Sequence, residues 1–280
     1  MRSHIMSCAT AFAFIACSTT HELTSPIATS GDEPFADHVV VTDVSCGDVL
    51  TTDVRLEKDL TCAGDALTIG ADGIRINLNG HTISGNATGV GITLRQRSDV
   101  VIHNGTVRNF VTGIFVSQST GVIVKDNGFT QNREAVFLIG SSGNVVKANT
   151  AWANTSRGIM LRPTTGGIVS TDNMVVGNTL IDNPSGILVF GQSGNTLKGN
   201  TITGSSVGGF DLTGGGGSGN EIKGNLVTGS AAGIKFGTGW TGNFIIDNTF
   251  ATNTCGLAGP GASNTYKDNV FASNVTNVCP

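Results

Sequence analysis

Apolar and polar residues alternate along most of this chain in short runs, and Gly, Asn or Ser interrupts each run. In the unit after Gly143, the runs are Val145-Val-Lys, then Ala151-Trp, then Gly158-Ile-Met-Leu-Arg. Alternation over so few residues is typical of strands, and no stretch sustains a helical period for long. We therefore predict three short strands in each unit.

The units repeat, and each contains an asparagine in the same local context. The spacing between successive asparagines is 21 to 29 residues. A fixed period of this length indicates stacked units, and three strands per coil make a parallel β-helix. A stacked Asn can bond the next turn and tolerates the left-handed conformation of a tight bend, so we interpret the column as scaffold. Its members are Asn79, Asn104, Asn127, Asn149, Asn178, Asn200, Asn225, Asn248 and Asn269.

The repeats and the segment Gly70-Ala-Asp-Gly-Ile-Arg-Ile-Asn-Leu-Asn-Gly-His-Thr-Ile83 resemble the right-handed parallel β-helix superfamily. That superfamily includes pectate lyases, polygalacturonases, alginate epimerases and NosD-like periplasmic proteins. The resemblance covers about residues 40–280 and implies an all-β chain, a single right-handed parallel β-helix of about nine to ten three-strand rungs. Because one fold carries many functions, it implies the fold more closely than the activity.

Aligning the rungs on the start of their third strand separates core from surface. One apolar pair per rung points inward, such as Ile114 with Val116, so the residues between and after them face out. The first outward column is Thr93, Phe115, Phe137, Met160, Leu188, Asp211 and Lys235. The neighbouring column is Arg95, Ser117, Ile139, Arg162, Phe190, Thr213 and Gly237.

Apolar side chains occupy much of this outward face. Exposed together, they would form a patch large enough for a protein partner, a second copy of the chain, or a sugar-stacking platform. The alternative is that residues 18–45 or a loop at 162–175 fold over the patch. We assign Phe115, Phe137, Met160 and Phe190 as candidate substrate contacts.

Three charged residues of this face are candidate catalytic residues. Asp211 and Lys235 fall on adjacent rungs, and Arg162 lies two rungs from Asp211 in the neighbouring column. Arg162 would neutralise the carboxylate of a uronate, and Lys235 or Asp211 would abstract its C5 proton. The alternative is a plain cross-strand ion pair between Asp211 and Lys235. Inverting hydrolysis needs two carboxyls facing one groove, whereas the aligned strands offer only Asp211.

A second charged column lies two residues before the repeated Asn. It contains Lys125, Lys147, Lys198, Lys223 and Lys267, of which we assign Lys147, Lys198 and Lys223 to an anionic glycan. The alternative is that Lys is simply a soluble choice on a solvated strand. Trp152, on another strand, is either a further sugar-stacking residue or a lone surface aromatic.

Composition narrows the classes of partner. The chain has 40 Gly, 13% charged residues and a formal net charge of −4, which argues against general nucleic-acid binding. All five His lie in the first 103 residues and share no column, so we expect neither a metal site nor a cofactor.

The N-terminus has the form of an export signal. Arg2 and His4 precede a short apolar run, and Phe14-Ile-Ala-Cys17 resembles a bacterial lipobox with Cys17 as the lipidated residue. Simple cleavage nearby is the alternative. We expect a signal at 1–17, a flexible tether at 18–38 and the β-helix at 39–280, with membrane attachment only through the lipid.

The cysteines fit the same compartment. Cys255 and Cys279 are about one rung apart, and Cys46 and Cys62 bracket the N-terminal end of the helix. We predict that both pairs are disulfides capping the open ends in an oxidising compartment.

Together these patterns predict an exported, periplasmic, cell-surface or secreted protein that interacts with polysaccharide. An acidic glycan is the preferred ligand, and a lyase or epimerase acting by C5 proton abstraction is the enzymatic form. The alternative is a non-catalytic structural, adhesion or partner-docking module that uses the apolar stripe, with an oligomer as one outcome.

Overall fold

A computed structural model describes residues 40–280, which belong to a unit that spans His38–Pro280. The predicted signal at 1–17, the lipidation at Cys17 and the tether at 18–38 lie outside the described residues. Every regular element of the described part is a strand, and no helix there is long and apolar enough to cross a membrane.

One strand of each rung, six residues long in the middle of the stack, belongs to a parallel sheet of eleven strands. We call its outer surface the long-strand face. In stacking order the strands are β2 (Asp48–Leu50), β5 (Leu67–Ile69), β8 (Val90–Arg95), β10 (Thr112–Ser117), β12 (Glu134–Ile139), β15 (Arg157–Arg162), β18 (Ser185–Phe190), β21 (Gly208–Thr213), β24 (Ala232–Phe236), β27 (Cys255–Ala258) and β30 (Thr276–Cys279).

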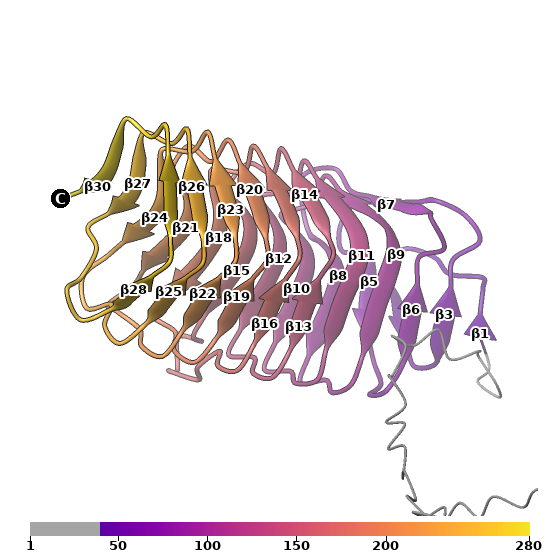
Figure 1. The fold of residues 1–280 in the computed structure, drawn as a ribbon. Helices are drawn as coiled ribbons and strands as arrows, with labels where there is room; N and C mark the ends of the chain where they lie inside the picture. The colour runs from indigo at the N-terminus through magenta and orange to yellow at the C-terminus, as the bar shows by residue number, and fades with distance from the viewer. Residues whose placement is uncertain (1–39) are drawn as a thin grey trace, which may run out of the picture. The chain divides into compact units, whose positions relative to one another are not determined.

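The remaining nineteen strands form a second parallel sheet that bends at a corner, so that each rung has three sides (Figure 1). The strands before the corner are β1 (Val40–Val41), β3 (Asp53–Arg55), β6 (Arg75–Asn77), β9 (Val101–Arg108), β11 (Ile123–Thr130), β13 (Val145–Lys147), β16 (Met174–Val176), β19 (Thr196–Lys198), β22 (Glu221–Lys223), β25 (Phe244–Ile246) and β28 (Thr265–Lys267); β9 and β11 continue through it. The strands after it are β4 (Leu60–Thr61), β7 (Thr82–Ser84), β14 (Thr150–Trp152), β17 (Thr179–Ile181), β20 (Thr201–Thr203), β23 (Leu226–Thr228), β26 (Thr249–Ala251) and β29 (Val270–Ala272).

The predicted inward pairs form the core of a right-handed parallel β-helix. Ile114 pairs with Ile92 on one side and Val136 on the other, and the same register continues rung after rung. These side chains are fully buried, because each rung covers the apolar residues of the previous one at about 4.8 Å spacing. The fold prediction is therefore confirmed.

The predicted asparagine column forms a hydrogen-bonded ladder, but the ladder begins at Asn127. Asn127 donates to Asn149 Oδ1 and to Ile102 O, and the later members up to Asn248 repeat this pattern with the next rung, whereas Asn269 in the last rung donates to Ile245 O. Asn104 is instead exposed with φ of 64°, which leaves Asn127 Oδ1 without a hydrogen-bond partner. From Asn127 onward the left-handed residue is the one before the ladder Asn, as in Asp126 and Gly177, which corrects our reason for Asn at the bend.

Two more asparagine ladders accompany the first. One contains Asn144, Asn173, Asn195, Asn220, Asn243 and Asn264. The other has two hydrogen-bonded parts, the first with Asn132, Asn154 and Asn183 and the second with Ser205, Ser230, Asn253 and Asn274. A buried amide at each corner satisfies backbone groups that the turn leaves without strand partners.

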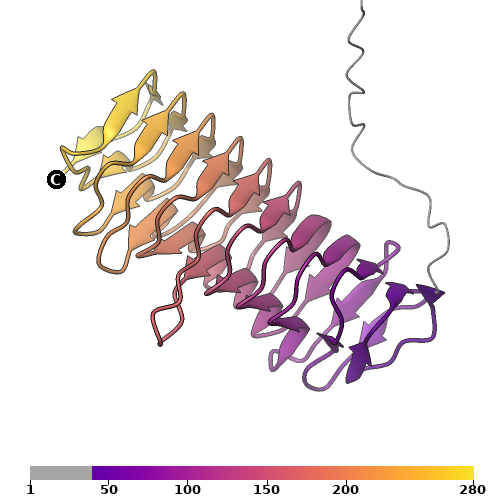
Figure 2. The same ribbon diagram turned by 90° about the horizontal axis from the view of Figure 1, so that it is seen from below.

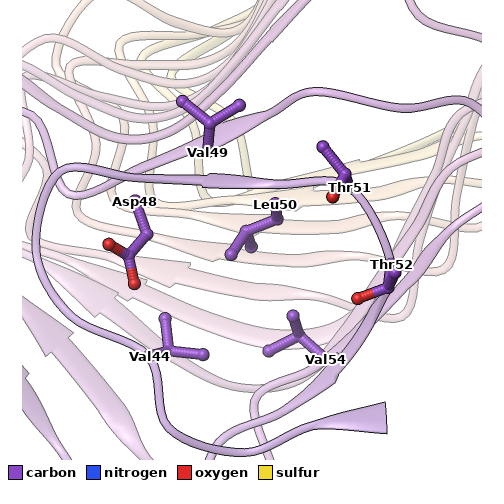
Figure 3. Close-up of a pocket in the computed structure, with 7 residues that line it drawn as sticks. All are labelled: Val44, Asp48, Val49, Leu50, Thr51, Thr52 and Val54. Carbon is purple, nitrogen blue, oxygen red and sulfur yellow. The ribbon is translucent and has the colours of Figure 1, made fainter. Parts of the chain in front are cut away.

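Both predicted disulfides are present at the ends of the solenoid. Cys46 bonds Cys62 and Cys255 bonds Cys279. The first rung also encloses a cavity of about 160 Å³, in which Val44, Leu50 and Val54 point toward one another while Val49 points away (Figure 3). That cavity contains one carboxylate and no cation, and it shares no residue with the predicted site.

Candidate functional site on the long-strand face

The register of the long-strand face brings most of the predicted residues onto one surface. Phe115 pairs with Phe137, Phe137 with Met160, and Asp211 with Lys235. The outward columns are therefore as predicted from the alternation.

The apolar part of that surface is packed rather than exposed. Met160 is 5% and Leu188 is 4% exposed, and Phe115 and Phe137 are half-buried in an edge-to-face pair with centroids 5.4 Å apart. The expectation of a wet apolar stripe is wrong here, because large side chains in register on successive rungs cover one another. Phe190 is the one member of the predicted platform that stays open, at 37% exposed.

Two arginines stack on the aromatic residues at the edge of this surface. The Arg95 guanidinium carbon lies 4.8 Å from the centre of the Phe115 ring, and that of Arg162 lies 5.5 Å from the Phe190 ring. Stacking leaves the guanidinium edge able to donate, and Arg162 Nε is buried with no hydrogen-bond partner in the described part of the chain. The Arg162 side chain thus extends onto the next rung, toward that of Asp211, and its Nε–H is an unused hydrogen-bond donor.

Asp211 is a buried carboxylate on an outward column. It is 5% exposed, Ser185 Oγ donates to its Oδ2 at 3.1 Å, and its Oδ1 has no hydrogen-bond partner among residues 40–280. Leu188 precedes it in the column and Lys235 follows it. No ion pair joins Asp211 to Lys235 among residues 40–280, so the plain ion-pair alternative is not what the structure shows.

Lys235 is exposed and stands beside a glycine-rich rim that sequence reasoning missed. A cavity of about 430 Å³ is lined by residues 236–241 with Gly259 and Gly261. Trp240, in the same rim, is buried, and its indole N–H has no hydrogen-bond acceptor among the residues that the structure describes. Four consecutive glycines at 214–217 and the two glycines of 237–239 signal this rim in the sequence, because they permit close approach of backbone.

Two loops border the stacked Arg162. The longest rung carries an extra loop after β15, which projects from the stack (Figure 2). Ile168 of this loop lies against Gly140, and Phe190 lies against Gly214 on the other side. The extra length predicted for this rung therefore borders the long-strand face.

A neighbouring buried ion pair has a structural role. Arg157 Nη1 donates to Glu134 Oε1 at 3.0 Å, and Arg133 Nε approaches the same oxygen at 3.5 Å. Glu134 and Arg157 thus form a cross-strand ion pair between β12 and β15.

The other predicted contacts lie on different sides of the solenoid. Lys147, Lys198 and Lys223 are the last residues of β13, β19 and β22, before the corner, whereas Trp152 ends β14, after it. Figure 1 shows β13, β16, β19 and β22 in front of β15, β18 and β21. Trp152 lies across Gly128 of the previous rung and is 37% exposed. The structure therefore separates the predicted residues into three surfaces.

Sequence and structure comparisons agree on the architecture. A family described as "Right handed beta helix region" matches residues 66–227 and 168–279. No curated protein matches the chain.

Several solved structures are similar to the chain in fold. The A-module of a mannuronan C-5 epimerase from Azotobacter vinelandii has a TM-score of 0.66 at 15% identity, over 86% of this chain and 76% of that one. An alginate lyase from Paenibacillus sp. str. FPU-7 has a TM-score of 0.60 at 13% identity, over 80% of this chain and 92% of that one. A DFA-IIIase from Arthrobacter chlorophenolicus A6 has a TM-score of 0.60 at 12% identity, over 83% of this chain and 66% of that one. At these identities the similarity shows the fold alone.

Proposed function

Because the chain belongs to the right-handed β-helix family, we propose that it is an exported protein that binds an acidic polysaccharide on its long-strand face and acts on it by C5 proton abstraction. The observation that carries this proposal is Asp211. A buried carboxylate with a free oxygen, on an outward column next to a lysine, costs stability unless a ligand uses it.

The neighbouring groups supply what such a reaction needs. Arg162 would pair with the carboxylate of the uronate, which stabilises the negative charge that develops when the C5 proton leaves. The Phe190 ring holds that guanidinium in place and offers an apolar surface for the sugar. Asp211 Oδ1 or the Lys235 amine would take the proton, and the other would steady the charge.

The similar structures support this choice of substrate class. Their names describe an epimerase acting on mannuronan and a lyase acting on alginate, both of which are polymers of uronates. Both disulfides are consistent with an oxidising compartment outside the cytoplasm.

The test uses the full chain with polymannuronate, polyguluronate and polygalacturonate. Ultraviolet absorbance of unsaturated product detects a lyase, and proton NMR of the polymer detects an epimerase. We expect turnover that falls about 10²-fold or more in Asp211→Asn or Lys235→Met, whichever removes the base. Arg162→Met should mainly raise KM, because it removes carboxylate pairing.

Lys58→Gln is the matched control, since Lys58 is an exposed cation near the N-terminal end. Binding without product would replace the enzyme with a non-catalytic glycan-binding module. If Arg162→Met and Asp211→Asn bound these polymers as well as Lys58→Gln, the long-strand face would not be the site.

A further inference from the structure

A basic column follows the strands before the corner, on a side of the solenoid away from Asp211. The register places Lys125 beside Lys147, and Lys198 beside Lys223. Val176 is the one residue between the two pairs. We call these four lysines, with Val176 between them, the lysine track.

The track places lysines side by side, and its two inner lysines, Lys147 and Lys198, have no carboxylate within ion-pair distance in the described part of the chain to offset their charge. Lysines directly paired across parallel strands repel one another, so the arrangement costs stability in the free protein. Lys125 and Lys223 each have a turn carboxylate at 3.9 Å, from Asp126 and Asp247. Lys147 and Lys198 are followed by Ala148 and Gly199 at the same turn, and neither forms an ion pair among the described residues.

An apolar lane runs beside the lysines on the same strands. Ile123, Val145 and Met174 occupy successive rungs in register, and Met174 is 45% exposed. Thr196 and then Glu221 continue this lane. A ligand lying here would meet ammonium groups along one edge and, over the first three rungs of the lane, apolar side chains along the other.

We propose that the lysine track is a second binding surface for a linear acidic polysaccharide, laid along the solenoid axis. It rests on the proposed function for its ligand class. The track holds the polymer without chemistry, because the neighbouring lane offers Glu221 as its only carboxylate within these rungs. Its role is to keep the polysaccharide near the long-strand face between turnovers.

The repeat of the track favours a uronate polymer over other polyanions. Rungs are spaced by about 4.8 Å, and an extended 1,4-linked chain advances by a similar distance per sugar, so its carboxylates meet lysines on successive or alternate rungs. Phosphates of duplex DNA follow a helical path that one straight column of four lysines cannot track. A net charge of −4 on the whole chain also disfavours nucleic acid and anionic membranes.

The experiment measures binding of the full chain to polymannuronate and polygalacturonate by titration calorimetry at low ionic strength. Lys147→Gln/Lys198→Gln removes the two uncompensated charges. We expect the double variant to bind about tenfold more weakly, which corresponds to about 1.4 kcal/mol. The difference should shrink as salt is added, because ions screen exposed charges.

Lys58→Gln/Arg108→Gln is the matched control, with the same change of net charge at exposed cations away from the track. Equal binding by the two double variants would overturn the track, as would tighter binding of wild type to duplex DNA or phosphatidylglycerol vesicles than to either polymer. If the lysine track did not bind the polymer, the expected results for Arg162→Met and Asp211→Asn would be unchanged. The binding test of the track can therefore fail without the catalytic proposal failing.

Discussion

Asp211 and Lys235 are direct neighbours in one outward column, yet the carboxylate of Asp211 bonds Ser185 rather than the lysine. The free Oδ1 is buried, and a buried acceptor without a partner costs about 1–3 kcal/mol. A residue that is retained at such a cost is a candidate for function.

Asp211→Leu should therefore stabilise the protein while removing activity. Leu188 already occupies the preceding position of the column, so an apolar side chain fits the surroundings. We expect the free energy of unfolding to rise by about 1 kcal/mol, measured by urea denaturation. Leu188→Asp is the reverse control and should lower it. A clear loss of stability in Asp211→Leu would mean that the carboxylate is structural.

The first asparagine ladder should be a major source of stability. Asn200 Oδ1 accepts from the backbone and side-chain nitrogens of Asn178, and Asn200 Nδ2 donates to Val175 O and Asn225 Oδ1. Asn200→Ala would leave these buried groups unpaired, and we expect a loss of about 3 kcal/mol in the free energy of unfolding.

Asn104→Gly is the control for that ladder, because Asn104 is exposed and its φ of 64° suits glycine. We expect a change below about 0.5 kcal/mol. If the two variants lost similar amounts of unfolding free energy, the side-chain hydrogen bonds of the ladder would contribute little to stability.

The sequence predicted the fold because alternation and period depend only on local residues. The three runs after Gly143 correspond to β13, β14 and β15, and every aligned inward pair is buried. The two further ladders also had a signal that we missed: Asn144, Asn149 and Asn154 are five residues apart, as are Asn173, Asn178 and Asn183.

The site was less predictable, because side-chain burial depends on the neighbours across rungs. The aligned sequence places Met160 outward between Phe137 and Leu188, but only the packed structure shows that this stacking buries its side chain. The sequence already assigned Trp152, Lys147 and Asp211 to different strands of their rungs. The structure adds that these strands lie on three surfaces of the solenoid.

The buried pair of Glu134 and Arg157 gives a prediction about coupling. Arg157→Met removes the main partner of a carboxylate that is nearly inaccessible, and Arg133 is only a longer contact. We expect a loss of about 2–3 kcal/mol in the free energy of unfolding, partly recovered in Glu134→Gln/Arg157→Met. Equal losses in the single and double variants would show no coupling between the two side chains.

Acid should weaken one contact between the early rungs. The backbone N–H of Thr82 and then the His81 side chain bond Asp59 and lower the pKa of this carboxyl below its ordinary value of 3.8. A lowered pKa in the folded state adds stability above pH 3.8, and that stability is lost as the pH falls through the lowered value. Wild type should thus exceed Asp59→Asn in Tm at neutral pH, with the gap closing in strong acid. The gap should be small, because the carboxylate is largely exposed. A gap that widened toward acid pH would contradict this.

The disulfide between Cys255 and Cys279 should hold the last rungs in place. It closes 24 residues of chain, and Cys255 lies within the stack on β27. Cys255→Ser/Cys279→Ser should lower stability by about 2–4 kcal/mol, because the unfolded state gains freedom. Hydrogen exchange should locate the loss in β27 to β30, since a solenoid frays from its ends. Cys46→Ser/Cys62→Ser is the control and should instead loosen β2 to β5. Uniform faster exchange in both variants would show that the solenoid unfolds as one cooperative unit.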